Sequence, residues 1–193
     1  ILVSESVVFF SHVPLWDFLT DTQWTPLFDD AHFGIMVLLS GTLVSSGVAL
    51  LVAIPLGTVI AVFLSEFAGP RLREIVKPML ELLSGVPTIV YGYFALLFVT
   101  PLLQKFLPEL PGFNLLSAGL VMGIMIIPTV SSIAEDAMRA VPMNLREGSY
   151  ACGATTWQTV SDHILPYSSA GILTGVIIGM ARAIGETAPI ITI

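Results

Sequence analysis

The chain has 193 residues, of which 55% are hydrophobic and only 11% are charged, and its mean hydropathy is +0.91. An average soluble domain carries about 25% charged residues, so this composition predicts a membrane protein. The net charge of −7 argues against nucleic-acid binding, which needs clustered Lys and Arg, and the single cysteine excludes an internal disulfide.

Residues 1–34 form the first recognisable segment. They contain aromatic side chains, two prolines and several acidic residues, but no Lys or Arg. The sequence starts at Ile1 and ends within an apolar run. We therefore expect a fragment of a longer protein, cut in or beside a spanning segment at its C-terminal end.

Four apolar runs follow, and each is about long enough to cross a membrane, which takes roughly 20 residues. They cover residues 35–65, 82–104, 110–134 and 167–193, and only Arg182 and Glu186 interrupt the last one. The runs predict an all-α, polytopic membrane bundle with four visible spans. The stretch SGVPTIVYGY (84–93) predicts a break or a bend, either beside a membrane entrance or as a proline kink made for packing.

The basic residues in the connections predict the orientation, because Lys and Arg gather in cytoplasmic loops. The links at about 66–81 and 135–166 together hold five Lys and Arg, whereas the opposite side holds only Lys105. We expect both links to be cytoplasmic, residues 1–34 to be external and residues 35–193 to form the transmembrane permease domain. An external start implies at least one further span upstream.

A charged pair lies within the last apolar run. On an ideal helix Gly171, Gly175 and Gly179 share one narrow face with Arg182 and Glu186. Glycines four residues apart let helix backbones approach closely, so this face should contact protein and not lipid. Insertion of an Arg at mid-membrane costs a free energy of roughly 2.5–3.5 kcal/mol on insertion scales. Such a cost indicates that the residue has a structural or functional role.

Two roles fit this pair. In the first, Arg182 offers its planar guanidinium to an oxyanion while Glu186 holds it ready and keeps the empty site neutral. In the second, Arg182 and Glu186 form an interhelical ion pair that serves only assembly.

The link LREGSYACGATTWQTVSDHILP (145–166) resembles the signature of ABC-importer permeases. That signature has a Glu followed by two small residues, a Gly six positions after the Glu, and an Ile-x-Leu-Pro close. His163 stands where the family usually has Ile. The matching positions are Glu147, Gly148, Ser149, Gly153, Leu165 and Pro166. The resemblance implies a type I importer fold and a coupling helix that docks on a separate ATPase subunit, with Gly153 in a tight turn.

The segment ARAIGETAP resembles the Arg-x-x-Gly-Glu-Thr motif of the phosphate-specific transport (Pst) permeases. Other similar stretches cover most of residues 34–193. QWTPLF (23–28) and AEDAMRAVP (134–142) favour the C-type paralogue, whereas GETAP (185–189) favours the A-type, and we expect the C-type. The resemblance implies an inorganic phosphate importer in the bacterial cytoplasmic membrane, with Arg182, Glu186 and Thr187 in the substrate pathway. The implied partners are a paralogous permease, two ATPase subunits and an external phosphate-binding protein.

Three other functions are alternatives to phosphate import. A permease for sulfate or molybdate would use the same arginine chemistry, and a structural subunit would use the charged pair as glue. A membrane enzyme would need a nucleophile, a base or a metal cluster. No such motif occurs at membrane depth, because His12, His32 and His163 lie outside the spans or on different sides. The chain also lacks a GxxxxGK[ST] phosphate loop, so ATP hydrolysis is expected in partner subunits and no cofactor is expected in this chain.

Overall fold

The computed structural model describes residues 2–28 and 30–186. Secondary structure in these residues is helical, apart from one isolated antiparallel bridge between Trp24 and Phe33. The chain forms two units, residues 1–44 and residues 45–193, which are described one at a time.

The first unit consists of α1 (Leu2–His12), α2 (Leu15–Thr20), a loop and the first turns of α3 (Ile35–Val62). Phe9 and Phe18 pack edge to face with ring centroids 5.9 Å apart, a favourable aromatic geometry.

The loop of the first unit is held by an ion pair between Asp21 and His32. Nδ1 of His32 lies 2.6 Å from Oδ2 of Asp21. This hydrogen bond raises the pKa of His32 and lowers the pKa of Asp21. Gly34 is required beside them, because a side chain there would run into the carbonyl of Asp21.

Three helical runs in the described residues are long and apolar enough to cross a membrane. The first is α3 with its π-helical end η1 (Phe63–Phe67), and the second is α7 (Leu115–Arg139). The third joins α9 (Thr156–Thr159), η3 (Val160–Ile164) and α10 (Leu165–Gly185). Even α7, with 25 residues, reaches about 37 Å at 1.5 Å per residue, against a hydrocarbon core of about 30 Å.

The run predicted as the second span, residues 82–104, is not one straight helix. Helix α4 (Pro70–Ser84) ends at the start of this run. After an 89° bend the chain continues as α5 (Thr88–Phe94), η2 (Ala95–Val99) and α6 (Thr100–Gln104). Pro87 explains the bend, because it cannot donate a helical hydrogen bond and it disfavours helical backbone at Val86. The predicted break is confirmed, and the bent pair counts as a fourth span only if both arms are taken together.

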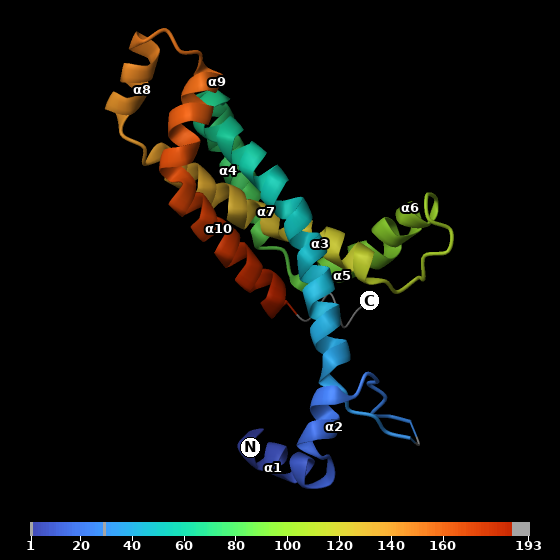
Figure 1. Cartoon of the computed structure of the whole chain (residues 1–193). Coiled ribbons are helices and arrows are strands. Elements are labelled where there is room, and N and C mark those ends of the chain that lie inside the picture. Colours follow the sequence, from blue (N-terminus) through green and yellow to red (C-terminus); the bar gives the residue numbers. More distant parts are fainter. Residues whose placement is uncertain (1, 29, 187–193) are drawn as a thin grey trace. The chain divides into compact units, whose positions relative to one another are not determined.

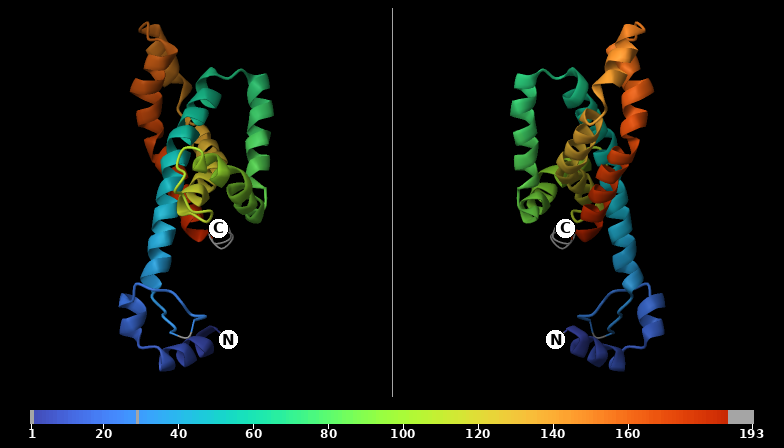
Figure 2. Two further views of the ribbon diagram at one scale, coloured as in Figure 1. Left: turned by 90° about the vertical axis from the view of Figure 1, so that its right-hand side faces the viewer. Right: turned by 90° about the vertical axis from the view of Figure 1, so that its left-hand side faces the viewer.

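Helix α7 is the centre of the second unit. Its buried side chains form one apolar cluster with residues of α3 and of the bent pair. They form a second cluster with Ala61 near the end of α3 and with residues of η3. Its Gly123 lies directly against Val52 and the carbonyl of Ala49 on α3. On its other side α10 packs along it (Figures 1 and 2).

The glycine stripe of α10 faces α7, as its spacing predicts. A methyl group on Gly179 would lie 3.0 Å from Ile126 and from Val130, and one on Gly171 would overlap Ala137. The expected protein-facing side of α10 is therefore confirmed, and the close approach of the two backbones is its physical reason.

Helix α8 (Met143–Ala151) lies in the link between α7 and α9. Figure 2 shows this link and the α3–α4 connection at the same end of the second unit. These two connections therefore lie on one side of the bundle. Most of the predicted links is helical, because residues 70–81 belong to α4, residues 135–139 to α7 and residues 156–166 to the run that continues into α10.

Candidate functional site

Arg182 lies in the last turn of α10 and reaches two other elements. Its Nη1 donates to Oγ1 of Thr129 on α7 at 3.1 Å, and its Nη2 donates to the backbone carbonyl of Ser84 at 3.4 Å. Ser84 is the last residue of α4, just before the bend. The guanidinium thus meets α7 and the free carbonyl end of α4, and its side chain is still 28% exposed.

Glu186 follows the last helical residue of α10 in extended backbone, with φ −80° and ψ 114°. Its Oε1 lies 3.7 Å from Nε of Arg182, so the predicted pairing is present as an ion pair. Thr187, the third predicted pathway residue, lies outside the described residues.

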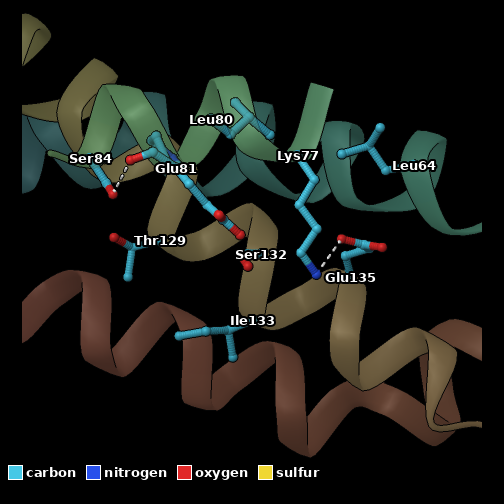
Figure 3. A pocket seen from close by; sticks show the side chains of 10 residues that line it. Leu64, Lys77, Leu80, Glu81, Ser84, Thr129, Ser132, Ile133 and Glu135 are labelled. Atoms are coloured by element: carbon cyan, nitrogen blue, oxygen red, sulfur yellow. Dashed lines mark hydrogen bonds and ion pairs between the residues drawn. The ribbon is translucent and has the colours of Figure 1, made fainter. Parts of the chain in front are cut away.

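A cavity of about 240 Å³ lies between α4, α7 and η1 (Figure 3). Ser84 and Thr129, the two residues that accept hydrogen bonds from Arg182, line it. Its other polar lining residues are Lys77, Glu81, Ser132 and Glu135. The cavity therefore runs from the partners of Arg182 toward a second charged group.

That second group centres on Glu135, whose side chain is only 1% exposed. Its carboxylate lies 2.6 Å from Nη2 of Arg73 and 3.2 Å from Nζ of Lys77, both on α4 (Figure 3 shows the lysine). Lys77 also donates to Asp136 at 2.8 Å. Sequence reasoning missed this cluster, although the i,i+4 spacing of Arg73 and Lys77 on a helix was a signal that both cations share one face.

The predicted coupling residues of α8 are partly exposed and partly buried. Glu147 and Gly148 are exposed on α8, whereas Ser149 is buried, with its hydroxyl 2.9 Å from that of Thr159. Gly153 has a φ of 85°, which confirms the predicted tight turn. The structure thus presents part of the signature outward and uses another part to hold the link together.

Leu165 and Pro166 start α10 directly after η3. Leu165 packs against the apolar cluster of α7 and η3, and Pro166 is exposed in the first turn of α10, directly after the π-helical turn η3. Both residues shape the entry into α10, away from the outer face of α8.

Sequence reasoning also missed the partner of Arg146 on α8. Its guanidinium pairs with Glu66 of η1 and donates to the backbone carbonyl of Met138 at 2.8 Å. The two charges lie 80 positions apart in the sequence, and no local spacing rule connects residues at that separation.

Within the described residues, no group of three or more His, Cys, Asp or Glu could hold a metal ion. The site consists of a guanidinium whose hydroxyl and carbonyl partners hold it in place and line a cavity. A guanidinium held in this way suits the binding of an oxyanion.

Residues 53–193, more than half of the chain, match the family described as binding-protein-dependent transport system inner membrane component. The chain belongs to this family. Membership confirms three predictions about the permease: its class is a transport component and not an enzyme, its fold is that of ABC-importer permeases, and its place is the inner membrane.

Relatives of this permease carry more specific names. The probable ABC transporter permease protein YqgH of Bacillus subtilis is 39% identical over 170 residues, which cover 88% of this chain and 55% of the relative. The phosphate transport system permease protein PstC of Haemophilus influenzae is 36% identical over 189 residues, covering 88% and 59%. The predicted resemblance to Pst permeases of the C-type is thereby confirmed, and the chain spans less than two thirds of the length of these relatives.

A solved structure confirms the fold. A chain from inward facing conformations of the MetNI methionine ABC transporter aligns with a TM-score of 0.58 and 21% identity, covering 79% of this chain and 68% of the other.

Proposed function

We propose that this permease forms part of the pathway of an ATP-driven importer of inorganic phosphate, in which the anion passes beside Arg182. The observation that carries the proposal is the position of the guanidinium. It is tied to α7 and to the C-terminal end of α4, the two residues that accept its hydrogen bonds line a cavity, and 28% of the Arg182 side chain is exposed.

The contacts of Arg182 suit a transient anion site. Thr129 and the Ser84 carbonyl fix the plane of the guanidinium, so an arriving oxyanion meets donors that are already oriented. Glu186, at 3.7 Å, balances the charge when no anion is present and competes with a bound one. A site of this kind binds an anion and also releases it, as transport requires.

The remaining parts of the proposal rest on the family. The permease would pair with a paralogous permease and two ATPase subunits, and an external binding protein would deliver phosphate. The end of the bundle with the basic links and α8 would face the cytoplasm. Its predicted coupling residues would dock on an ATPase subunit, and ATP-driven closure would switch the pathway between its two openings.

Two alternatives keep support. Another oxyanion such as sulfate or molybdate would meet the same guanidinium. A purely structural role for Arg182 is favoured by the fact that its three nitrogens all have protein partners nearby.

The test is uptake by the assembled permease in proteoliposomes, with labelled phosphate and with labelled sulfate. Arg182→Gln should lower phosphate uptake about 10- to 100-fold, the factor expected from losing a hydrogen-bonded charge. Arg182→Lys should keep part of the activity, since the charge stays but the planar fork is lost. Lys105→Gln removes an exposed cation elsewhere and should transport like the wild type.

Three results would contradict the proposal in different ways. Wild-type uptake of Arg182→Gln would remove the arginine from the pathway. If Arg182→Gln lowers the amount of assembled complex but not the uptake per complex, the structural ion pair would be favoured. Import of sulfate in place of phosphate would favour the other oxyanions.

A further inference from the structure

The side chain of one arginine, Arg146, ties helix α8 to η1 at the end of α3 and to the end of α7. Nη1 of Arg146 bonds Oε2 of Glu66 in η1, and Nη2 donates to the carbonyl of Met138 near the end of α7 at 2.8 Å. The side chains of Arg146 and Glu66 are 13% and 4% exposed. One guanidinium therefore joins α8 to the ends of two spans at once.

The carboxylate of Glu66 is held on both sides. Its Oε1 accepts a hydrogen bond from the hydroxyl of Ser65 at 2.6 Å, while Oε2 meets Arg146. A buried charge pair keeps its geometry only when its remaining polar atoms also find partners. The Glu66 side chain is therefore a fixed anchor for whatever Arg146 carries.

The other contacts of α8 lead to the third span, which begins with α9 and η3. It packs on α9 and η3, and the buried hydroxyl pair of Ser149 and Thr159 reinforces that side. Toward the membrane helices lies a recess of about 480 Å³, lined in part by Arg73, Arg139 and Tyr150. Among the hydrogen bonds of the described residues, those from α8 side chains to η1 and α7 come from Arg146.

We infer that Arg146 is a positioning residue that transmits displacement of α8 to α3 and α7, through Glu66 and the Met138 carbonyl. The inference rests on the proposed docking of α8 on an ATPase subunit. Movement of α8 reaches α10 through Ser149, α9 and η3, and it reaches α7 through the chain at residues 140–142 and through Arg146. It reaches α3 through the bond of Arg146 to Glu66. Without this link, α3 would lag behind α7 and α10, and ATP hydrolysis would no longer be matched to transport.

The π-helical turn η1 gives the link a place to act. Such turns hold one extra residue within a helix and occur frequently at functional sites. Glu66 lies in η1 at the end of α3, so a pull on its carboxylate acts where the helical hydrogen bonds are already irregular.

The experiment measures phosphate transported per ATP hydrolysed by the assembled transporter in proteoliposomes. Arg146→Gln and Glu66→Gln should assemble and keep basal ATP hydrolysis, but transport per ATP should fall about 10-fold, as expected from the loss of one charged hydrogen bond. Arg146→Lys should give an intermediate ratio, because an ammonium group can satisfy Glu66 but cannot reach both acceptors in the planar geometry.

Two comparisons sharpen the result. The double variant Glu66→Arg with Arg146→Glu should recover part of the ratio that each single change loses. Arg71→Gln removes an exposed cation from α4 at the same end of the bundle and should leave the ratio unchanged.

A wild-type ratio in Arg146→Gln, with only the amount of assembled complex reduced, would show a structural staple and overturn the inference. If Arg146→Gln does not assemble, a wild-type ratio in both Arg146→Lys and Glu66→Gln would overturn it equally. Failure of the proposed function looks different, because wild-type transporter would then not import phosphate. The ratio for the anion that it does import would still decide the role of Arg146.

Discussion

Gly153 turns the chain between α8 and α9 with a φ of 85°, in the left-handed region that side chains with a Cβ rarely adopt. No atom lies within 4 Å of where its Cβ would be. The need for glycine is therefore one of backbone conformation and not of space. The capping box of Thr155 and Gln158 then starts α9 directly after the turn.

This separation of causes gives a prediction at the residue scale. Gly153→Ala should lower the local stability of the turn by about 1–2 kcal/mol, the cost of left-handed backbone for an ordinary residue. Gly148→Ala is the matched control, because Gly148 is helical, exposed and equally free of neighbours, and alanine there should be neutral or slightly stabilising. Amide hydrogen exchange of α8 and α9 measures both, and equal exchange in the two variants would contradict the prediction.

At the scale of elements, the arrangement of α3, α7 and α10 depends on small residues. Apolar burial drives helices together weakly inside a lipid bilayer, so close backbone approach supplies the attraction. Gly119 and Gly123 bring α7 against α3, and Gly175 and Gly179 bring α10 against α7. Larger residues at these positions would force the helices apart along their length.

Gly123→Ala tests this packing. The added methyl would lie 2.9 Å from the carbonyl oxygen of Ala49 and from Cβ of Val52, and backbone cannot yield as a flexible side chain does. Overpacking of this kind costs about 1–3 kcal/mol, to be measured as the free energy of unfolding in a denaturing detergent titration. Gly47→Ala in α3, with no atom within 4 Å, is the control and should not destabilise. Equal stability of the two variants would mean that α3 and α7 are less close.

At the scale of the whole molecule, the second unit combines apolar packing with three separate charged contacts. Arg182 joins α10 to α7 and to the end of α4, Glu135 joins α7 to α4, and Arg146 joins α8 to η1 and α7. In each contact a charged side chain bonds to a polar or charged group of an element distant in sequence. Such contacts hold a geometry that apolar surfaces in lipid specify poorly.

The ion pairs of Glu135 join α7 to α4, and α4 packs mainly against α7. Loss of the Glu135 charge should therefore affect the stability of the whole unit. Glu135→Gln leaves Arg73 and Lys77 without their buried counter-charge and should lower the free energy of unfolding by about 3 kcal/mol, at the low end for a broken buried pair since both cations are partly exposed. Asp136→Asn is the neighbouring control; its side chain is 64% exposed, and its bond to Lys77 should contribute at most about 1 kcal/mol. Similar losses in both variants would contradict the distinction between buried and exposed pairs.

The candidate site was only partly predictable for a physical reason. The cost of a charge in an apolar run marks Arg182 and Glu186 in the sequence itself, and an i,i+4 spacing predicts their pairing. Thr129 and Ser84 carry no such mark, because hydroxyl and carbonyl groups are common in helices and acquire meaning only when α7 and α4 come near α10. The substrate-pathway and coupling roles of the predicted residues remain predictions.

The amino-acid sequence by itself determined the apolar runs, the glycine face of α10, the break at Pro87 and the turn at Gly153, because each follows from local rules of hydropathy, helical period and backbone sterics. The tertiary structure alone decided which groups the charged side chains reach: Arg146 meets Glu66, Arg73 and Lys77 meet Glu135, and Arg182 meets the backbone carbonyl at the end of α4. An ion pair between helices depends on how their axes are placed in space. That placement results from the packing of all the spans together, and no window of sequence contains it.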